Sequence, residues 1–198
     1  MAKIAVVHHS GYGHTKVMAE SVVVGAKSVA GTEVELVGVD ELPAPGKDRV
    51  YAGRWAVLNA ADAIIMGSPV YMGSVSAKFK EFMEASSGLW YQQAWKDKLA
   101  SGFVNSGSMS GDKFKAMMDI VTLAGQHSMV WVSQGLMPSS QKSGDPEGLN
   151  RIGSWLGTMS QSDQAGPDAT PPAGDRKSAE HLGARVAQAA ARWKRGAV

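Results

Sequence analysis

The stretch Lys3-Ile4-Ala5-Val6-Val7-His8-His9-Ser10, continued by Gly11-Tyr12-Gly13-His14-Thr15, decides the fold of this chain. Its unbroken apolar run is typical of a strand that is buried on both faces of a parallel sheet. Two glycines and two hydroxyl side chains follow, and a helical pattern begins directly after them. Because the N–H groups at the start of a helix attract anions, these are the parts of a phosphate-binding turn. Lys16 stands where GxGxxG has its third glycine, so the turn alone also fits an ordinary strand-to-helix connection.

Length and composition narrow the class of protein. The 198 residues suffice for one well-buried domain, which we expect to span residues 1–198. The formal net charge is +2 and charges of one sign form no long run, so nothing indicates a nucleic-acid partner. The sequence has no cysteine, which excludes disulfides, a thiolate nucleophile and sulfur ligands for a metal. We assign no metal ligands.

Nothing in the sequence predicts export or a membrane anchor. The first strand begins within three residues of Met1, which leaves no room for a signal peptide. No apolar stretch approaches the roughly 18 residues that a membrane-spanning helix needs. We therefore expect a cytoplasmic protein without a membrane span.

Strand and helix patterns alternate five times along the chain. Beyond the fifth strand neither period is visible and Gly, Ser, Pro and Asp are abundant, so we expect an extended loop at about 133–173 before the C-terminal helix. The expected strands are 3–10, 33–39, 63–66, 99–105 and 129–132, and the expected helices are 15–29, 55–60, 75–83, 114–124 and 182–193.

This alternation predicts an α/β fold with a doubly wound parallel sheet of five strands, strand order 2-1-3-4-5 and helices on both faces. Ligands of such sheets bind beyond the carboxyl ends of the strands, where the strand order reverses. Turns rich in glycine and serine follow strands one, three and four, at residues 10–15, 67–74 and 106–111. In this strand order the three turns converge, so we expect them to form one site.

Three kinds of site that such a fold hosts do not match the sequence. A phospho-acceptor domain needs acidic residues in place of His8-His9, and an aspartate where Met66-Gly67 ends the third strand. A serine hydrolase needs serine at the centre of GxSxG, but Met109 occupies the centre of the corresponding turn. A dinucleotide fold needs the missing third glycine, although Asp40 is placed to bind a ribose hydroxyl.

The chain resembles flavodoxin-like proteins, and among them the WrbA-like NAD(P)H:quinone oxidoreductases, over nearly its whole length. Each motif is weak alone, but together they are specific. The motifs are Ser10-Gly11-Tyr12-Gly13-His14, Gly67-Ser68-Pro69-Val70-Tyr71 with Gly73, Gly88-Leu89-Trp90, Lys98-Leu99-Ala100-Ser101, Ser106-Gly107-Ser108, Thr122-Leu123-Ala124 and His127-Ser128-Met129-Val130.

The resemblance implies FMN as the cofactor and NADH or NADPH as the cosubstrate. It places the phosphate on the first turn and the isoalloxazine ring between the second and third turns. Trp90 and His127 are implied as catalytic residues near the exposed face of the ring. The implied cofactor-binding residues are Ser10, Gly11, Tyr12, Gly13, His14, Thr15, Pro69, Val70, Tyr71, Met72, Gly73, Ser74, Ser106, Gly107, Ser108 and Gly111.

The implied activity is the transfer of two electrons from the nicotinamide nucleotide to a quinone-like acceptor, with hydride chemistry supplied by the flavin. His127 is expected to hydrogen-bond the reduced flavin or the quinone oxygen, a role that imidazole fills near neutral pH. The family usually carries an Arg-Phe pair in its second turn, where this chain reads Val70-Tyr71-Met72. Segment 138–155 also departs from the family, so no acceptor preference carries over, and free flavin, azo dyes and nitro compounds stay open.

Two other functions fit the same fold. A flavodoxin-type electron carrier passes single electrons between proteins, but such carriers tend to be strongly acidic, whereas this chain has a net charge of +2. A regulatory or interaction protein would keep the fold and bind no ligand, and the retained glycine- and serine-rich turns argue against it. The resemblance further implies a homo-oligomer, a dimer or tetramer, with sites near the subunit interfaces.

Overall fold

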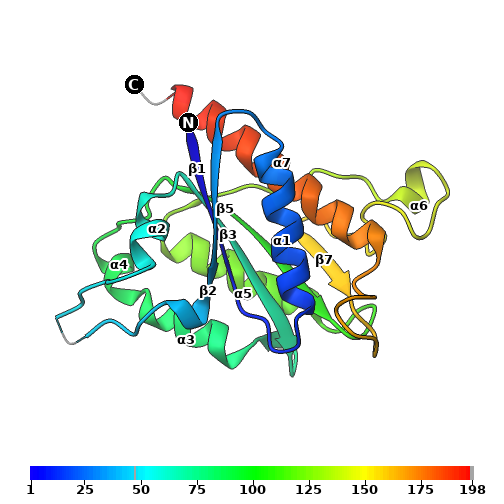
Figure 1. The fold of residues 1–198 in the computed structure, drawn as a ribbon, viewed down its shortest axis with the longest axis horizontal. Helices are drawn as coiled ribbons and strands as arrows, with labels where there is room; N and C mark the ends of the chain where they lie inside the picture. The colour runs from blue at the N-terminus through cyan, green and yellow to red at the C-terminus, as the bar shows by residue number, and fades with distance from the viewer. Residues whose placement is uncertain (47, 197–198) are drawn as a thin grey trace.

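A parallel sheet with five strand positions forms the centre of the protein (Figure 1). The computed structural model describes residues 1–46 and 48–196. The strands lie in the order β2-β1-β3-β5-β6, which confirms the predicted order 2-1-3-4-5 and the doubly wound class. Their bounds are Ala2–His8 for β1, Thr32–Gly38 for β2, Ala63–Tyr71 for β3, Leu99–Ser106 for β5 and Val130–Trp131 for β6.

Helices cover both faces of the sheet, as predicted. In β1, Ile4 and Val6 belong to one apolar core and Ala5 and Val7 to another, because successive side chains of a strand point to opposite faces. Helices α1 and α7 close the first core, and α2, α3, α4 and α5 close the second. Their bounds are His14–Lys27 for α1, Trp55–Ala60 for α2, Ala77–Ala85 for α3, Ser87–Tyr91 for α4, Lys113–Gln126 for α5 and Ala173–Gly196 for α7, and a 3-10 helix, η1, spans Val39–Glu41.

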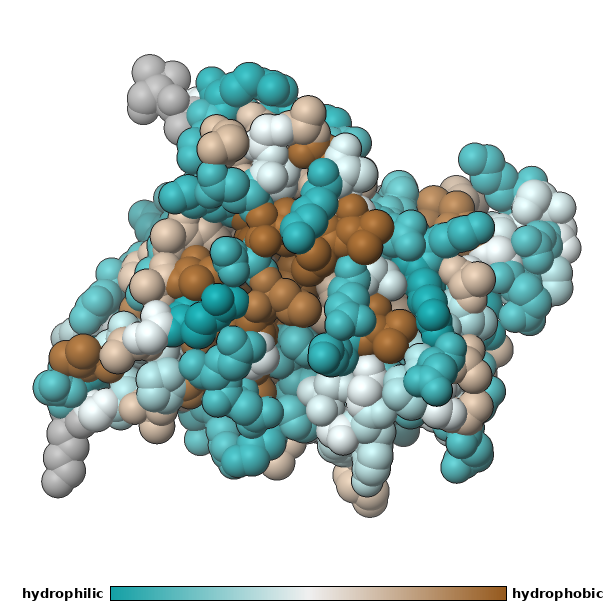
Figure 2. Space-filling model, viewed as in Figure 1, coloured by the Kyte–Doolittle hydropathy of each residue, from teal (hydrophilic) through white to brown (hydrophobic). Residues whose placement is uncertain are grey.

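Strand β2 forms one edge of the sheet. Its Glu33 and Glu35 are exposed, and charged side chains on an edge strand oppose pairing with another chain. On the side of the molecule that faces the viewer, Figure 2 shows apolar side chains gathered around β2 and α1. No helix within residues 1–46 and 48–196 is both long and apolar enough to cross a membrane.

Two strands share the fifth position of the sheet, which corrects the loop expected at 133–173. β6 pairs with the start of β5 at Leu99 and Ala100, whereas β7 (Thr158–Gln161) pairs with its end, from Phe103 to Ser106. A four-residue helix, α6 (Ser139–Lys142), lies between them. The sequence Thr-Met-Ser-Gln has no apolar run, so β7 gives no strand signal, and its pairing with β5 is what holds it in the sheet.

The second turn is a hairpin that begins later than expected. β3 runs through Gly67, Ser68 and Pro69 to Tyr71, turns at Met72 and Gly73, and pairs antiparallel with β4 (Ser74–Val75). Both turn residues have positive φ, +49° and +75°, which suits a tight two-residue hairpin. Gly67 is needed for packing and not for a turn, because an added Cβ would overlap the ring of Phe103 on β5.

Helices α1 and α7 cross in close contact through two glycines. An added Cβ at Gly25 of α1 would overlap the carbonyl of Glu180, and one at Gly183 of α7 would overlap the carbonyl of Val22. The two backbones therefore touch, and this contact fixes where α1 begins at the carboxyl edge of the sheet.

We predict that Gly183→Ala destabilises the protein by about 1–3 kcal/mol, the usual cost of overpacking. The matched control is Gly125→Ala in α5, where an added Cβ meets nothing within 4 Å. That control should leave stability unchanged or raise it by about 0.5–1 kcal/mol, because alanine has a higher helix propensity than glycine. Urea unfolding measures both, and equal stability of the two variants would contradict the close contact of α1 with α7.

Candidate cofactor site

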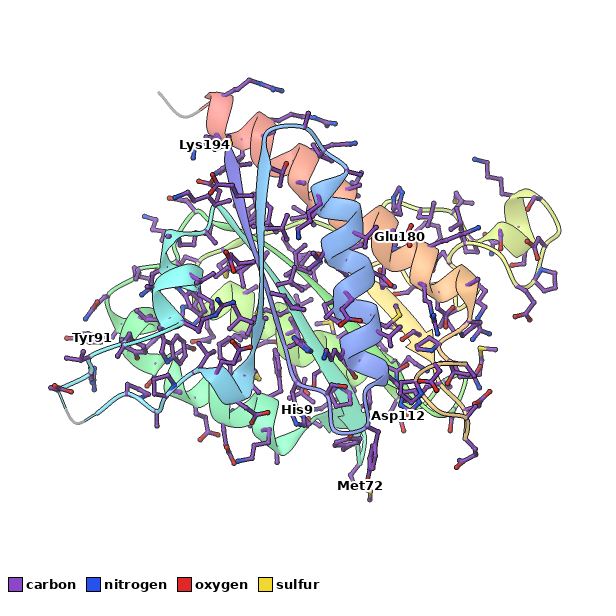
Figure 3. All side chains as sticks on the ribbon, viewed as in Figure 1. His9, Met72, Tyr91, Asp112, Glu180 and Lys194 are labelled. Carbon is purple, nitrogen blue, oxygen red and sulfur yellow. The ribbon has the colours of Figure 1, made fainter. Side chains whose placement is uncertain are left out.

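The carboxyl edge of the sheet holds a cavity of about 150 Å³. Residues at the carboxyl ends of β3 and β5 meet there with residues that follow β1, β5 and β7, and His9, Met72 and Asp112 mark this edge in Figure 3. The three predicted turns therefore do converge. The cavity is lined by Ser10, Gly11, Tyr12, His14, Thr15, Pro69, Val70, Tyr71, Asn105, Ser106, Gly107, Ser162 and Asp163.

Ser10 organises the turn between β1 and α1. Its hydroxyl oxygen accepts hydrogen bonds from the N–H groups of Gly13 and Lys16, each at 3.1 Å. Gly13 has a φ of +94°, in the left-handed region that favours glycine. An added Cβ there would lie 2.9 Å from Cγ of Pro167, so the turn has no room for a side chain at this position.

The first residues of α1 offer hydrogen-bond donors to the cavity. Within residues 1–46 and 48–196, the N–H groups of His14 and Thr15 donate to no protein acceptor, and both residues line the cavity. The imidazole of His14 lies within hydrogen-bond distance of the Ala165 carbonyl, Nε2 to O 2.8 Å, so the backbone is the part of His14 that stays free. Free N–H groups at the positive end of a helix form an anion site.

Two tyrosines stand at the mouth of the cavity. The rings of Tyr12 and Tyr71 meet edge to face, with centroids 6.4 Å apart. The Tyr71 hydroxyl lies so close to Gly11 that an added Cβ on Gly11 would collide with it. Burial raises the pKa of Tyr71, so this hydroxyl stays protonated at neutral pH. Tyr12 is exposed, so its ring is available to a flat ligand.

Three lining residues were not predicted: Asn105, Ser162 and Asp163. Nδ2 of Asn105 donates to Oγ of Ser162 at 2.9 Å, and its Oδ1 accepts from Oγ of Ser160 on β7 at 2.8 Å. These bonds fix the end of β5 to the end of β7. Because β7 has no apolar pattern, its contribution to the site left no signal in the sequence.

Several predicted cofactor-binding residues lie outside the cavity lining. Ser74 donates to Oδ2 of Asp119 on α5 at 2.7 Å, and Met72 is fully exposed at the hairpin tip. The Ser108 carbonyl accepts a hydrogen bond from Lys113, and Ser108 does not line the cavity. The predicted residues outside the lining are Gly13, Met72, Gly73, Ser74, Ser108 and Gly111.

The expected place of Trp90 and His127 beside the ring is wrong for a site within one chain. His127 follows α5 and lies near the start of β5, at the amino edge of the sheet, and it is fully buried. Trp90 belongs to α4, whose last residue, Tyr91, lies well apart from the carboxyl edge in Figure 3. The sequence motifs that contain Trp90 and His127 do not indicate at which edge of the sheet these residues lie.

His127 has the surroundings of a packing residue. Its ring lies against Trp95, with centroids 4.4 Å apart. Ser86 donates to the Met83 carbonyl at 2.7 Å, so its oxygen accepts from Nε2 of His127 at 2.9 Å. Burial lowers the pKa of His127 to about 4, which keeps the ring neutral at physiological pH.

The adjacent histidines of β1 and the following turn also serve packing. Nδ1 of His8 lies 3.2 Å from the Val37 carbonyl, and Nδ1 of His9 lies 2.8 Å from Oγ of Ser76. Burial lowers the pKa of both rings. In the described part of the chain, no group of three or more His, Asp or Glu side chains is placed to hold a metal ion.

Comparison with known proteins identifies relatives along nearly the whole chain. Residues 3–143 match a family described as NADPH-dependent FMN reductase. Flavodoxin FldP of Pseudomonas aeruginosa (strain UCBPP-PA14) is 36% identical over 188 residues, 95% of this chain and 96% of that protein. Quinone-oxidoreductase QR2 of Triphysaria versicolor is 30% identical over 180 residues, 81% of this chain and 86% of that protein.

The solved structures agree with this assignment. The crystal structure of a WrbA-like flavodoxin from Agrobacterium tumefaciens is 37% identical, with a TM-score of 0.69, and the match covers 97% of this chain and 99% of that one. The flavodoxin-like fold and the resemblance to WrbA-like proteins are thereby confirmed. The expected cofactor, FMN, and the expected cosubstrate fit the description of the family.

We predict that His127 makes stability depend on pH. Its pKa is about 4 in the folded chain and about 6.5 when unfolded, so the unfolded chain takes up a proton more readily. The stability of the folded chain is therefore full above pH 6.5 and falls as the pH drops toward 4. Between pH 7 and pH 5 the unfolding free energy should fall by about 2 kcal/mol on account of this residue. His127→Phe keeps the ring against Trp95 and should remove that part of the fall, as measured by urea unfolding at both pH values. An unchanged pH profile in the variant would show that His127 titrates normally.

Proposed function

Because the chain belongs to the NADPH-dependent FMN reductase family, we propose that it is an FMN-dependent oxidoreductase. It takes two electrons from NADH or NADPH and passes them to a quinone-like acceptor. The observation that carries the proposal is the pair of free N–H groups at His14 and Thr15, which line a cavity beside glycines that tolerate no side chain. FMN, when bound, supplies the hydride chemistry.

The cavity suits the phosphate end of FMN. Its volume of about 150 Å³ lies below the 300–1,000 Å³ that is usual for a whole cofactor, so it fits a phosphate group and the adjoining chain. The free N–H groups of α1 and the helix dipole compensate the phosphate charge, which explains why the turn needs no arginine. Tyr12 and Tyr71 at the mouth of the cavity offer aromatic surface that would hold the planar ring.

The remaining residues of the cavity hold its shape and exclude water. Asn105, fixed by Ser160 and Ser162, ties the third turn to β7. Val70 and Pro69 present apolar surface from β3. We assign no proton-transfer role to His127, because it is buried at the other edge of the sheet.

An electron carrier of the flavodoxin type is the second candidate. The relative named flavodoxin FldP favours it, since the match covers 95% of this chain. The two functions differ in the electron donor, because an oxidoreductase accepts hydride directly from a pyridine nucleotide and a carrier depends on a partner protein.

The visible spectrum of the purified protein with added FMN separates the candidates. We predict a flavin spectrum that bleaches under anaerobic conditions with NADH or NADPH and returns on addition of a quinone. Bleaching with dithionite alone would favour the electron carrier. A protein that takes up no FMN would contradict both candidates and leave a regulatory protein without a ligand.

We predict that Gly13→Val abolishes FMN binding, because a β-branched side chain would meet Pro167 and would strain the left-handed backbone of the turn. The matched control is Gly31→Val. Gly31 also has positive φ, +75°, but an added Cβ meets nothing within 4 Å there. Both variants should lose some stability, whereas only Gly13→Val should lose FMN in a fluorescence titration. Tight binding by Gly13→Val would exclude the phosphate turn.

We further propose that the chain forms a homo-oligomer, a dimer or tetramer, in the cytoplasm. Trp90 on α4 is 42% exposed and does not line the cavity of its own chain. If Trp90 contacts a flavin, that flavin is bound to a second copy. Sedimentation at working concentration tests the proposal, and a monomer would contradict it.

A further inference from the structure

A cluster of buried charges lies directly behind the third turn, residues 106–111. Lys113 at the start of α5 is 1% exposed, and the side chains of Arg151 and Asp175 are 5% and 1% exposed. Arg151 Nε and Asp175 Oδ1 are 2.8 Å apart, and Nη2 and Oδ2 are 3.2 Å apart. Two cations and one carboxylate leave one net positive charge in the interior. Glu147 is 4.0 Å from Arg151, but its side chain is 72% exposed, so water screens its charge.

Lys113 is hydrogen-bonded to the backbone of the third turn. Its Nζ donates to the carbonyl oxygens of Ser108 at 2.6 Å and Met109 at 3.0 Å. Those two carbonyl groups therefore face the cluster. In the part of the chain that the structure describes, the N–H groups of Gly107, Ser108 and Met109 donate to no protein acceptor. The turn thus has its acceptors occupied and its donors free, which suits an electron-rich ligand at the cavity.

The ion pair is tied to the same turn through Gln161 of β7. Nη2 of Arg151 donates to Oε1 of Gln161 at 3.2 Å, and Nε2 of Gln161 donates to the Gly107 carbonyl at 3.2 Å. Oδ2 of Asp175, in the first turn of α7, accepts the Gln161 N–H at 2.9 Å. The cluster is therefore connected to three carbonyl groups of the turn and cannot shift without moving it.

We propose that Lys113, acting with Arg151 and Asp175, is a positioning residue that favours the reduced flavin at this turn. The inference rests on the proposed function. Oxidised FMN gains two electrons and one proton when it accepts a hydride from NADH or NADPH, so the reduced ring carries one more negative charge. A buried positive charge behind the turn stabilises that added charge more than it stabilises the oxidised ring, because few waters screen it.

The cost of burying Lys113 agrees with this role. Burial lowers the pKa of its ammonium group to about 8, with Asp175 acting against the shift and Arg151 adding to it. No carboxylate in the described residues forms an ion pair with Lys113. The added negative charge of the reduced flavin would offset the cost of burying the Lys113 ammonium group. By reciprocity, Lys113 stabilises the reduced flavin by the same amount.

The test compares the affinity for reduced FMN with the affinity for oxidised FMN, obtained from the two-electron midpoint potential of the bound flavin. Lys113→Gln removes the charge and keeps a donor for the turn. We predict that it lowers the ratio of the affinities at least tenfold, which corresponds to a fall of about 30 mV. Asp175→Asn removes the negative charge and should shift the potential in the opposite direction. A purely structural effect on the turn would not reverse its sign between the two variants.

Lys96→Met is the matched control, because Lys96 is an exposed lysine at the amino edge and its loss should leave the potential unchanged. If the parent binds FMN and both cluster variants leave the potential unchanged, or shift it in the same direction, the inference is overturned while the proposed function stands. If the parent binds no FMN, the proposed function fails first. Should Lys113→Gln fail to fold, the sign of the shift in Asp175→Asn decides the matter.

Discussion

The parallel pairing of β1 with β2 on one side and β3 on the other determines where the chain can bind a ligand. β1 is hydrogen-bonded along both edges and covered by a separate apolar core on each face. The chain therefore leaves β1 at the carboxyl edge of the sheet, between the turns that follow β2 and β3. The strand order reverses at this point, and the cavity lies there for that reason.

The contact of α1 with α7 carries this constraint into the site. Gly25 and Gly183 let the two backbones touch, which sets the axis of α1 and the position of its first N–H groups. The first turn of the same helix α7 holds Asp175, which forms an ion pair with Arg151. Packing on one face of the sheet thus positions the phosphate donors and the buried charges together.

The sequence predicted what depends on local pattern. The apolar run of β1 and the turn at 10–15 were visible because burial on two faces and a tight turn each demand particular residues. β7 was missed because Thr158–Gln161 has no apolar pattern and is held by pairing with β5. His127 was misplaced because its motif does not reveal the edge of the sheet to which α5 delivers it. Lys113 was not predicted, because its burial depends on residues far away in the sequence, such as Arg151 and Asp175.

The proposed binding of FMN depends above all on the backbone donors of the first turn, which would hold the phosphate group. The most direct measurement compares the dissociation constants of FMN and riboflavin, which share the ring and differ in the phosphate, by fluorescence quenching at constant ionic strength. Two good charge-assisted hydrogen bonds contribute about 3 kcal/mol or more, so FMN should bind at least about a hundredfold more tightly than riboflavin. Equal affinity for the two ligands would show that the turn at the start of α1 does not bind phosphate.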